Sequence, residues 1–541
     1  MTKNISRIFA LIGISALCAC TGNYEEYNTD PYAVTAEEME RDGYSVKAAL
    51  VNLGSAVIST DVNTTQFTEC LLGGTQGGYM ADAGAFSNTI SNYNATDNWT
   101  NVFFSSDKFI PIIYPNYQLL QTVTDDEVIL AVADVIRVAA MHRITDTYGP
   151  IPYSQIGADG SLTVAYDSME DIYNQMFEEL DADIDVLLEN VTNNFTSSAD
   201  PVYGGVVENW IKYANSLKLR LAMRVVYADE SLAKEMAESA VDEERGGVMT
   251  SNDDNATFAS YGTDGNPINV SVEYNMVSTH SDGTSCTTES GDSHVAADII
   301  AYMNGYNDPR REAYFTEGEW DGYDYVGMRR GIDIPDHSTY GHKYSGFNIG
   351  TTDPLVWMNA AEVAFLEAEA VAVFGFDMGI TAQEAYETGI QLSFDQWGVS
   401  GADDYIADDT SVPELYTDPR GADSYSDVIS TITIAWDESA TTEEKQERII
   451  TQKWIANWLL GCEAWADWRR TGYPYLMPVV SNKSNGVVDS AHGLRRMPYP
   501  ASEAVSNGTN YAYAVSTLLG GTDNYNTRLW FDCKSNNPNY N

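Results

Sequence analysis

Positive charge is scarce in this chain. Its 541 residues include 29 lysines and arginines against 79 aspartates and glutamates, which gives a formal net charge of -50 at pH 7. A surface of this sign repels polyphosphates and polyanionic sugars. The charge balance therefore excludes nucleic acids and anionic polysaccharides as general partners, and it favours uncharged ligands.

Histidine and cysteine are also rare, with six of each. The histidines form no His-Glu-x-x-His pair, no nucleophile elbow is present, and the glycines of 73–78 are not followed by the lysine of a phosphate-binding loop. The cysteines are too widely and irregularly spaced for a zinc site or a disulfide framework. We expect no metal and no cofactor. Buried free thiols are favoured, with an isolated bridge left open, among Cys70, Cys286, Cys462 and Cys533.

Long apolar runs are missing beyond the N-terminus. There, Lys3 and Arg7 precede an apolar run at 8–17, which at about ten residues is far short of the roughly twenty needed to span a membrane. This pattern is typical of a signal peptide. We therefore predict a signal peptide over 1–19 and a soluble body after it.

The run ends in Leu17-Cys18-Ala19-Cys20, which resembles a bacterial lipobox. We predict that Cys20 becomes the lipidated first residue of a tether over 20–42, because several acyl chains would anchor the chain stably. The alternative is a plain cleaved signal with two incidental cysteines. Glu25 and Glu26 resemble the acidic export signal of surface lipoproteins, which favours an outer-membrane protein facing the cell exterior.

The remaining residues, 43–541, can bury one large core or two smaller ones, and the 44% hydrophobic and 11% aromatic residues of the whole chain fit an ordered globular protein. Most periodic stretches have helical spacing. Helices are predicted over 126–148, 206–226, 355–374, 382–397, 443–460 and 463–470. Another helix is predicted to begin after Ser168, which would cap its N-terminus.

The alanine-rich stretch 355–374 and the helix after Gly375 and Gly379 predict an antiparallel helical hairpin. The fold class is therefore mainly α, with TPR-like stacked helical hairpins, although no TPR consensus matches cleanly. Long loop-rich insertions are expected at about 73–104, 250–345 and 400–440. The strand signal is thin, and the segments 269–274 and 428–435 are predicted to form small β-hairpins.

Several segments in a fixed order resemble the SusD/RagB family of nutrient-binding outer-membrane lipoproteins, in its second SusD-like subgroup. The segments are Asn28-Thr29-Asp30-Pro31-Tyr32, 143–153 (RITDTYGPIPY), 361–370 (AEVAFLEAEA), 452–456 (QKWIA), 463–474 (EAWADWRRTGYP) and 495–500 (RRMPYP) with Glu503 and Asn507. Each is weak alone, and the ordered set is specific. Cys462, beside Gly461, departs from the family pattern.

The resemblance implies a TPR-like scaffold that packs on a SusC-like, TonB-dependent transporter barrel. The loop-rich part would form a lid and ligand site. It also implies a protein that binds its cargo without cleaving it, so no catalytic residue is predicted.

Charged residues in two helices invite a catalytic interpretation. Glu463, Asp467 and the adjacent arginines lie within two helical turns, and charges at this spacing form local ion pairs. Glu362 and Glu369 lie seven apart and suggest a glycosidase pair, but pairing with arginines such as Arg470 is the favoured interpretation. We also interpret His142, near the apolar face of its helix, as a core histidine.

Aromatic residues in polar loops are the positive signal for function. Sugars present apolar faces with a rim of hydroxyls, so their sites combine aromatic rings with amides or carboxylates. Two insertions, 73–104 and 261–344, supply this mixture. Trp99 and Trp320 are the leading candidates, since an indole in a Gly/Asn-rich loop should have little core to occupy. The predicted ligand-binding residues are Tyr79, Tyr93, Asn94, Trp99, Asn101, Tyr274, Trp320, Tyr323 and Tyr325.

Three hypotheses remain open. The leading one is a surface lipoprotein that captures neutral oligosaccharides for a partner transporter. The second keeps the fold but binds peptides, for which main-chain-directed amides and a pocket for a charged terminus would be expected. The third is a glycan-degrading enzyme, which needs two carboxylates in one cleft at roughly 5 to 9 Å separation.

Overall fold

The computed structural model describes residues 43–82, 89–101, 109–157, 161, 163–274, 276, 279, 282–285, 291–333 and 339–540. Cys20, the signal peptide and the tether lie outside these residues, as does Cys286. Among the described residues, no helix combines the length and apolar character needed to cross a bilayer.

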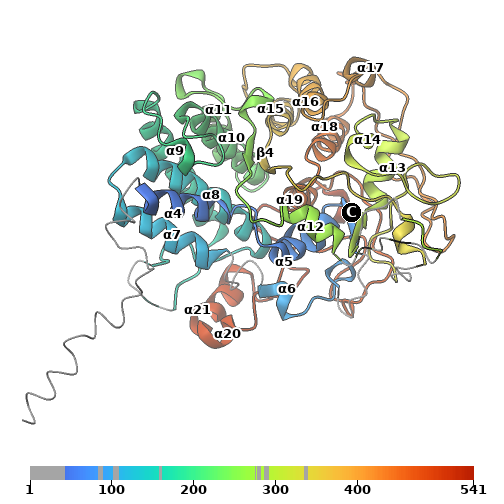
Figure 1. The fold of residues 1–541 in the computed structure, drawn as a ribbon, viewed down its shortest axis with the longest axis horizontal. Helices are drawn as coiled ribbons and strands as arrows, with labels where there is room; N and C mark the ends of the chain where they lie inside the picture. Colours follow the sequence, from blue (N-terminus) through green and yellow to red (C-terminus); the bar gives the residue numbers. More distant parts are fainter. Residues whose placement is uncertain are drawn as a thin grey trace, which may run out of the picture.

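The N-terminal half forms one layer of helical pairs (Figure 1). Its helices are α4 (Tyr44–Gly54), α7 (Ile110–Val123), α8 (Glu127–Tyr148), α9 (Met169–Glu189), α10 (Val207–Val225) and α11 (Glu230–Ala240). Asp126, Ser168 and Asp229 each accept main-chain N–H groups of the first turn that follows them, which fixes where α8, α9 and α11 begin. The predicted Ser168 cap and the helices at 126–148 and 206–226 are confirmed.

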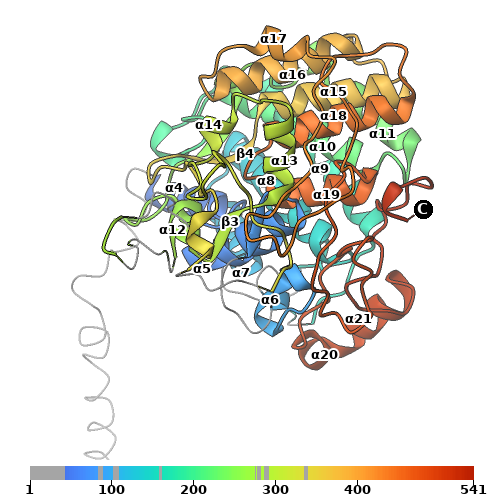
Figure 2. The same cartoon turned by 90° about the vertical axis from the view of Figure 1, so that its right-hand side faces the viewer.

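A second set of helices covers this layer: α15 (Ala360–Phe374), α16 (Ala382–Gln396), α18 (Thr442–Ala456) and α19 (Gly461–Thr471). Figure 2 shows α15, α16 and α18 stacked beyond α10 and α19. The hairpin of α15 and α16 is confirmed. Gly375 ends α15 in the left-handed conformation. At Gly389 the two helices are so close that an added Cβ would lie 2.8 Å from the Phe365 ring.

One short antiparallel sheet joins the first two insertions to each other, and a second ties the 250–345 insertion to the scaffold. β1 (Met80–Asp82) pairs with β3 (Ser293–Val295), and β2 (Ala256–Phe258) pairs with β4 (Leu355–Met358). The predicted helix at 355–374 therefore begins only at Ala360. Asn359 accepts the N–H of Glu362 as its cap, and the four residues before it are a strand. A short apolar run is compatible with a helix or a strand, and here pairing with β2 makes Leu355–Met358 a strand.

Both predicted β-hairpins are wrong. The segment 269–274 lies almost wholly in α12 (Pro267–Glu273), because Asn266 caps the first turn and Pro267 occupies its first position. The segment 428–435 has no regular structure. Its main-chain carbonyls accept hydrogen bonds from side chains instead of a strand: Tyr306 donates to Ile432, Arg448 to Thr433 and Tyr386 to Ile434.

Short elements complete the chain. They are α5 (Val62–Thr65), a π-helix η2 (Gln66–Gly74), α6 (Asp97–Asn101), α13 (Ala297–Gly305), α14 (Arg311–Tyr314), α17 (Ala402–Ile406), α20 (Glu503–Ser506), α21 (Gly508–Tyr513), a second π-helix η8 (Ala514–Leu518), and 3-10 turns at Ile90–Asn92, Ser197–Ala199, Glu243–Arg245, Asn252–Asp254, Gly341–Lys343 and Pro538–Tyr540.

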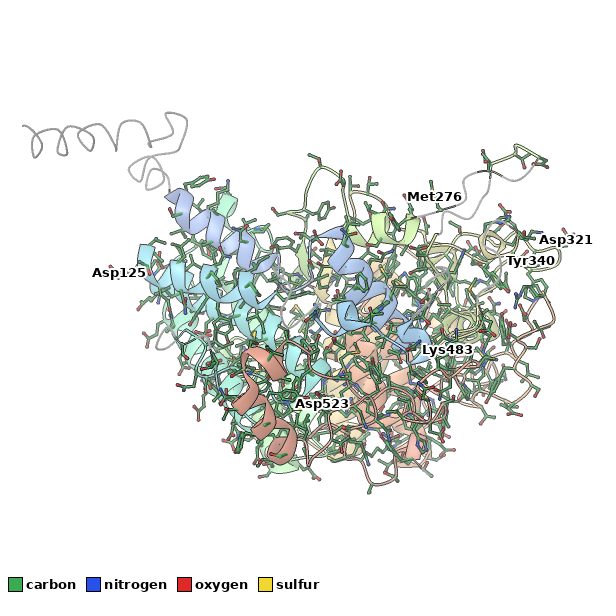
Figure 3. All side chains as sticks on the ribbon, turned by 90° about the horizontal axis from the view of Figure 1, so that it is seen from below. Asp125, Met276, Asp321, Tyr340, Lys483 and Asp523 are labelled. Carbon is green, nitrogen blue, oxygen red and sulfur yellow. The ribbon has the colours of Figure 1, made fainter. Side chains whose placement is uncertain are left out.

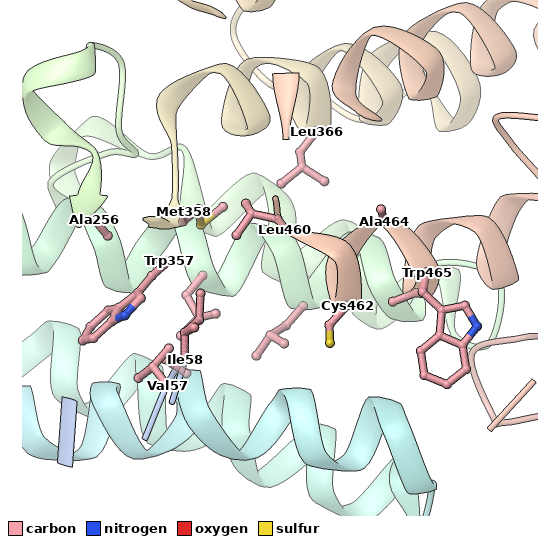
Figure 4. Packing of buried hydrophobic residues seen from close by; sticks show 14 of the residues in the cluster. Val57, Ile58, Ala256, Trp357, Met358, Leu366, Leu460, Cys462, Ala464 and Trp465 are labelled. Carbon is pink, nitrogen blue, oxygen red and sulfur yellow. The ribbon is translucent and has the colours of Figure 1, made fainter. Parts of the chain in front are cut away.

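The main core runs through both helical sets. Figure 4 shows Val57 and Ile58 in one cluster with Trp357, Leu460 and Trp465. A small satellite core lies under the loops: Ala81, in strand β1 of the first insertion, packs with Val326, Met328, Ile332 and Tyr344 of the second. The two insertions are therefore held to each other, and the loop-rich side lies opposite α4 and α7 (Figure 1).

Candidate functional site

The charged residues that suggested catalysis form buried ion pairs. Glu369 accepts two hydrogen bonds of 2.7 Å from Arg470, and Glu362 accepts two of 2.7 Å from Arg220. All four side chains are at most 5% exposed. The structural interpretation of both glutamates is thus confirmed, because their oxygens are occupied by guanidinium groups of the scaffold.

The segment that begins at Glu463 belongs to the same interior network. Arg224 contacts Glu463 at 2.5 Å and Asp146 at 3.1 Å, while Lys453 lies 2.8 Å from Asp467. Arg224 and its neighbours hold the pKa of Glu463 at about 2 against the effect of burial. This network joins α8, α10, α18 and α19, so its charges stabilise the packing of the scaffold helices.

His142, Cys70 and Cys462 agree with their structural interpretations, whereas Cys533 does not, because its thiol is free but exposed. Burial lowers the pKa of His142 to about 3, so its imidazole is neutral in the core. Cys70 and Cys462 are buried free thiols, and Cys533 is free and exposed. Within the described ranges no group of three or more His, Cys, Asp or Glu residues is arranged to hold a metal ion.

The predicted site residues of the first insertion are mostly buried. Tyr79 is fully buried, donates a hydrogen bond to the main-chain oxygen of Trp454 and stacks on its ring at 5.5 Å. Trp99 is 4% exposed and packs edge-on against Phe67 at 4.6 Å. The expectation that Trp99 has little core to occupy is therefore wrong. Tyr93 is 3% exposed, and burial raises its pKa to about 12.

The side chains of Asn94 and Asn101 are half-buried. Tyr274, by contrast, is 53% exposed just after α12. The structure therefore does not gather the predicted residues of 79–101 and Tyr274 around one open platform. Their contact with a ligand stays a prediction.

Trp320, Tyr323 and Tyr325 are brought together by the loop after α14. Trp320 and Tyr323 pack on the satellite core, and the N–H of Tyr323 donates to the main-chain oxygen of Trp320 across a turn at Gly322. The Trp320 ring stacks on Tyr340 with centroids 6.0 Å apart, and Lys343 lies 5.0 Å from the same ring. Figure 3 shows Asp321 and Tyr340 together at the edge of the loop-rich side.

A cleft of about 500 Å³ opens beside this loop. Three separate segments line it, and the lining residues are Ile300, Asn304, Arg311, Gly322, Tyr323, Asp324, Tyr325, Val326, Glu414, Leu415, Tyr416 and Thr417. Two of the predicted residues, Tyr323 and Tyr325, are among them. Gly322 has a left-handed φ of 85°, and a Cβ added there would have no atom within 4 Å. The turn beside the cleft is therefore uncovered.

Polar side chains hold one another in place in this cleft. Arg311 donates to the Asn304 side-chain oxygen at 2.8 Å, and the Asn304 amide donates to Glu414 at 2.8 Å and to the main-chain oxygen of Tyr325 at 3.2 Å. The guanidinium of Arg311 also lies 4.5 Å from the centre of the Tyr325 ring. An aromatic face, a fixed amide and a fixed carboxylate therefore meet at one point.

Burial raises the pKa of both Tyr325 and Glu414 above their ordinary values. For Tyr325 the charge of Glu312 adds to the effect of burial, and for Glu414 the hydrogen bond from Asn304 opposes it. Tyr325 is therefore an uncharged phenol at neutral pH, able to donate and accept a hydrogen bond.

Sequence reasoning missed Asn304, Arg311, Glu414 and Tyr416. They come from α13, α14 and the 400–440 insertion, which the sequence marks only as loop-rich. Tyr416 is anchored by donating to the main-chain oxygen of Gly327 at 2.8 Å, a contact between distant segments. An aromatic residue in the polar stretch after Pro413 was the one signal available.

Comparison with known proteins supplies an independent result. Residues 26–532 match the model of the SusD-like family, described as Susd and RagB outer membrane lipoprotein. None of the curated proteins searched matches the chain.

Solved structures are similar over almost the whole chain. A SusD homolog from Bacteroides uniformis is 54% identical, with a TM-score of 0.87, and the match covers 91% of this chain and 100% of that one. A susD homolog from Bacteroides thetaiotaomicron is 38% identical, with a TM-score of 0.81 and coverage of 91% and 99%. A chitin-binding SusD homolog from Flavobacterium johnsoniae is 37% identical, with a TM-score of 0.82 and coverage of 91% and 99%.

Proposed function

The chain belongs to the SusD/RagB family of outer membrane lipoproteins, and from this premise we propose that it binds neutral oligosaccharides and delivers them to a TonB-dependent transporter. The observation that carries the ligand class is the cleft of Tyr323, Tyr325, Arg311, Asn304 and Glu414. The chitin-binding relative supports a carbohydrate ligand.

The chemistry of the cleft fits a sugar ring. Tyr323 and Tyr325 offer apolar ring surface. The guanidinium of Arg311 offers further N–H donors, and Glu414, held by the Asn304 amide, offers an acceptor. A hydroxyl group can satisfy either kind of partner, because it donates and accepts. Since the lining includes two carboxylates, Asp324 and Glu414, against the single cation Arg311, an anionic sugar is disfavoured.

A binding titration tests the proposal. The Tyr323→Ala variant of the purified protein is compared with Tyr513→Ala, which removes a 53% exposed tyrosine of α21 that does not line the cleft. Isothermal titration against neutral hexasaccharides of different linkage should show binding that falls at least about tenfold in Tyr323→Ala, a loss of about 1.4 kcal/mol. Equal affinities in the two variants would refute the cleft as the site.

The same titration separates the competing functions. Binding of short peptides but of no oligosaccharide would favour the peptide-uptake alternative. Appearance of shortened products after prolonged incubation would identify an enzyme, with Asp324 and Glu414 as the carboxylates to test. We propose that the oligosaccharide is recovered intact, because the family to which the chain belongs captures cargo for uptake.

Anchoring and partnership form the second part of the proposal. A lipid on Cys20 would hold the domain at the outer membrane, facing the cell exterior, where it could cover a SusC-like barrel. Labelling with a tritiated fatty acid should mark the wild-type chain and leave Cys20→Ser unlabelled. Detergent extracts should yield the barrel with the wild type, and recovery of the chain alone would argue against the partnership.

A further inference from the structure

A second and larger hollow lies on the scaffold side of the molecule. It has a volume of about 760 Å³ and runs between the β2–β4 sheet, the start of α12, the end of α16 and the turn after α18. It shares no lining residue with the cleft of Tyr323 and Tyr325. Two of its apolar wall residues, Ile58 and Leu460, are seen in Figure 4. We call this hollow the scaffold groove.

Several polar atoms in the lining of the scaffold groove lack hydrogen-bond partners. Within the described part of the chain, these are the indole N–H groups of Trp397 and Trp458 and the side-chain oxygen of Gln396. Trp458 is only 4% exposed. Buried polar groups in folded proteins are nearly always paired, so three unpaired atoms around one hollow are unusual. These three atoms have almost no solvent-accessible surface, so a ligand in the groove would pair with them after a small shift of the side chains that cover them.

The backbone of the scaffold groove is also strained. Leu459 has a φ of 78°, in the left-handed region that a branched side chain rarely adopts, and it lines the groove between Trp458 and Leu460. Such positions are concentrated at ligand sites, where the surrounding structure maintains them. The strain thus falls on the same turn that presents the unpaired indole of Trp458.

Charge defines the class of ligand. No lysine, arginine or histidine lines the scaffold groove, whereas Asp253, Asp353 and Asp395 do. Phosphates, carboxylates and sulfates are therefore excluded. Asn209, also in the lining, makes no side-chain hydrogen bond among the described residues, which leaves a free amide beside the carboxylates. Indole donors, amides and carboxylate acceptors around apolar walls suit a chain of uncharged hydroxyl-bearing rings.

We propose that the scaffold groove is a second binding site for neutral oligosaccharides. This goes beyond the proposed function, because the groove and the cleft have no residue in common and either could bind alone. Both contact α14: Arg311 lines the cleft, and Tyr314 packs on Trp397 at 4.7 Å and on Trp458 at 5.6 Å. Variants of the groove must therefore be compared with a variant that leaves α14 untouched.

The experiment uses isothermal titration of the purified protein with maltohexaose, cellohexaose, xylohexaose, mannohexaose and N-acetylated chitohexaose. The groove variants are Trp397→Ala and Trp397→Phe; the second keeps a ring but removes the indole N–H. The cleft variant is Tyr323→Ala. The matched control is Trp436→Ala, which removes a half-buried indole that already donates to Glu438 at 2.9 Å and lines neither hollow.

We expect at least one hexasaccharide to retain binding in Tyr323→Ala and to lose at least tenfold in affinity in Trp397→Ala. The affinity of Trp397→Phe should lie between those of the wild type and Trp397→Ala, and the affinity of Trp436→Ala should match that of the wild type. The proposal is overturned if Tyr323→Ala removes all binding, if Trp397→Ala and Trp436→Ala bind equally, or if only peptides bind. If the groove variants lose affinity for the hexasaccharides while Tyr323→Ala keeps the wild-type affinity, the groove is supported as a binding site and the cleft is refuted as one.

Discussion

Replacing Glu369 by glutamine should destabilise the scaffold far more than removing a surface carboxylate. Glu369 is fully buried and accepts from both terminal nitrogens of Arg470 and from the Gln446 amide, each at 2.7 Å. In Glu369→Gln the guanidinium of Arg470 stays buried without its full counter-charge. The new amide NH2 group also faces an N–H donor of Arg470 where a carboxylate oxygen had accepted. Such losses cost about 3–5 kcal/mol. Asp467, 2.9 Å from Arg470, offsets part of this, so we expect about 3 kcal/mol.

The size of the chain sets the measurable shift. An unfolding entropy of about 2 cal/mol/K per residue gives about 1 kcal/mol/K for 541 residues, so the melting temperature should fall by about 3 °C. Circular dichroism on heating measures it. The matched control is Glu238→Gln, which breaks the Lys234–Glu238 pair on the surface of α11; its expected cost is below about 0.5 kcal/mol. Equal shifts for the two variants would refute the reasoning.

Three further predictions concern the cleft, a buried acid and the anchor. Arg311→Ala should weaken oligosaccharide binding in isothermal titration, because Arg311 orients Asn304 and covers Tyr325; unchanged affinity would contradict this role. Burial beside Asp134 raises the pKa of Asp183 to about 10, so the stability that its proton contributes below pH 4 is lost as the pH rises towards 10. Asp183→Asn should therefore melt above the wild type at pH 8 and close to it at pH 4, and a constant difference would refute the assignment. Cys20→Ser should move the protein from the membrane fraction to the soluble fraction, as an immunoblot of the two would show.

The helical scaffold could be predicted from the sequence because its signals are local. Apolar spacing and a capping residue such as Ser168 act within one turn, and these signals place most helices within a few residues of their observed ends. The pairing of Glu369 with Arg470 could be anticipated too, since a carboxylate among alanines on a buried helix face needs a partner. The Asn266-Pro267 cap is an equally local signal, and it explains why the segment 269–274 lies in a helix and not in a strand.

The candidate site could be predicted only in part, because burial in loops is decided by distant partners. Trp99 and Trp320 have similar polar neighbours in sequence. Phe67 covers Trp99 from another element, whereas Trp320 lies at the edge of the satellite core. Asn304 and Glu414 meet in the cleft although 110 positions separate them. No spacing rule within one segment could have joined them.

The scarce positive charges explain why both hollows suit uncharged cargo. Many of the arginines are buried in ion pairs within the scaffold, among them Arg220, Arg224, Arg310, Arg470, Arg495 and Arg496. The surface is therefore left with even fewer cations than the composition suggests. The cleft contains one arginine and the scaffold groove none. Ionic interactions hold the helices in register, and ligand recognition is left to rings, amides and carboxylates, which favour hydroxyl groups over anions.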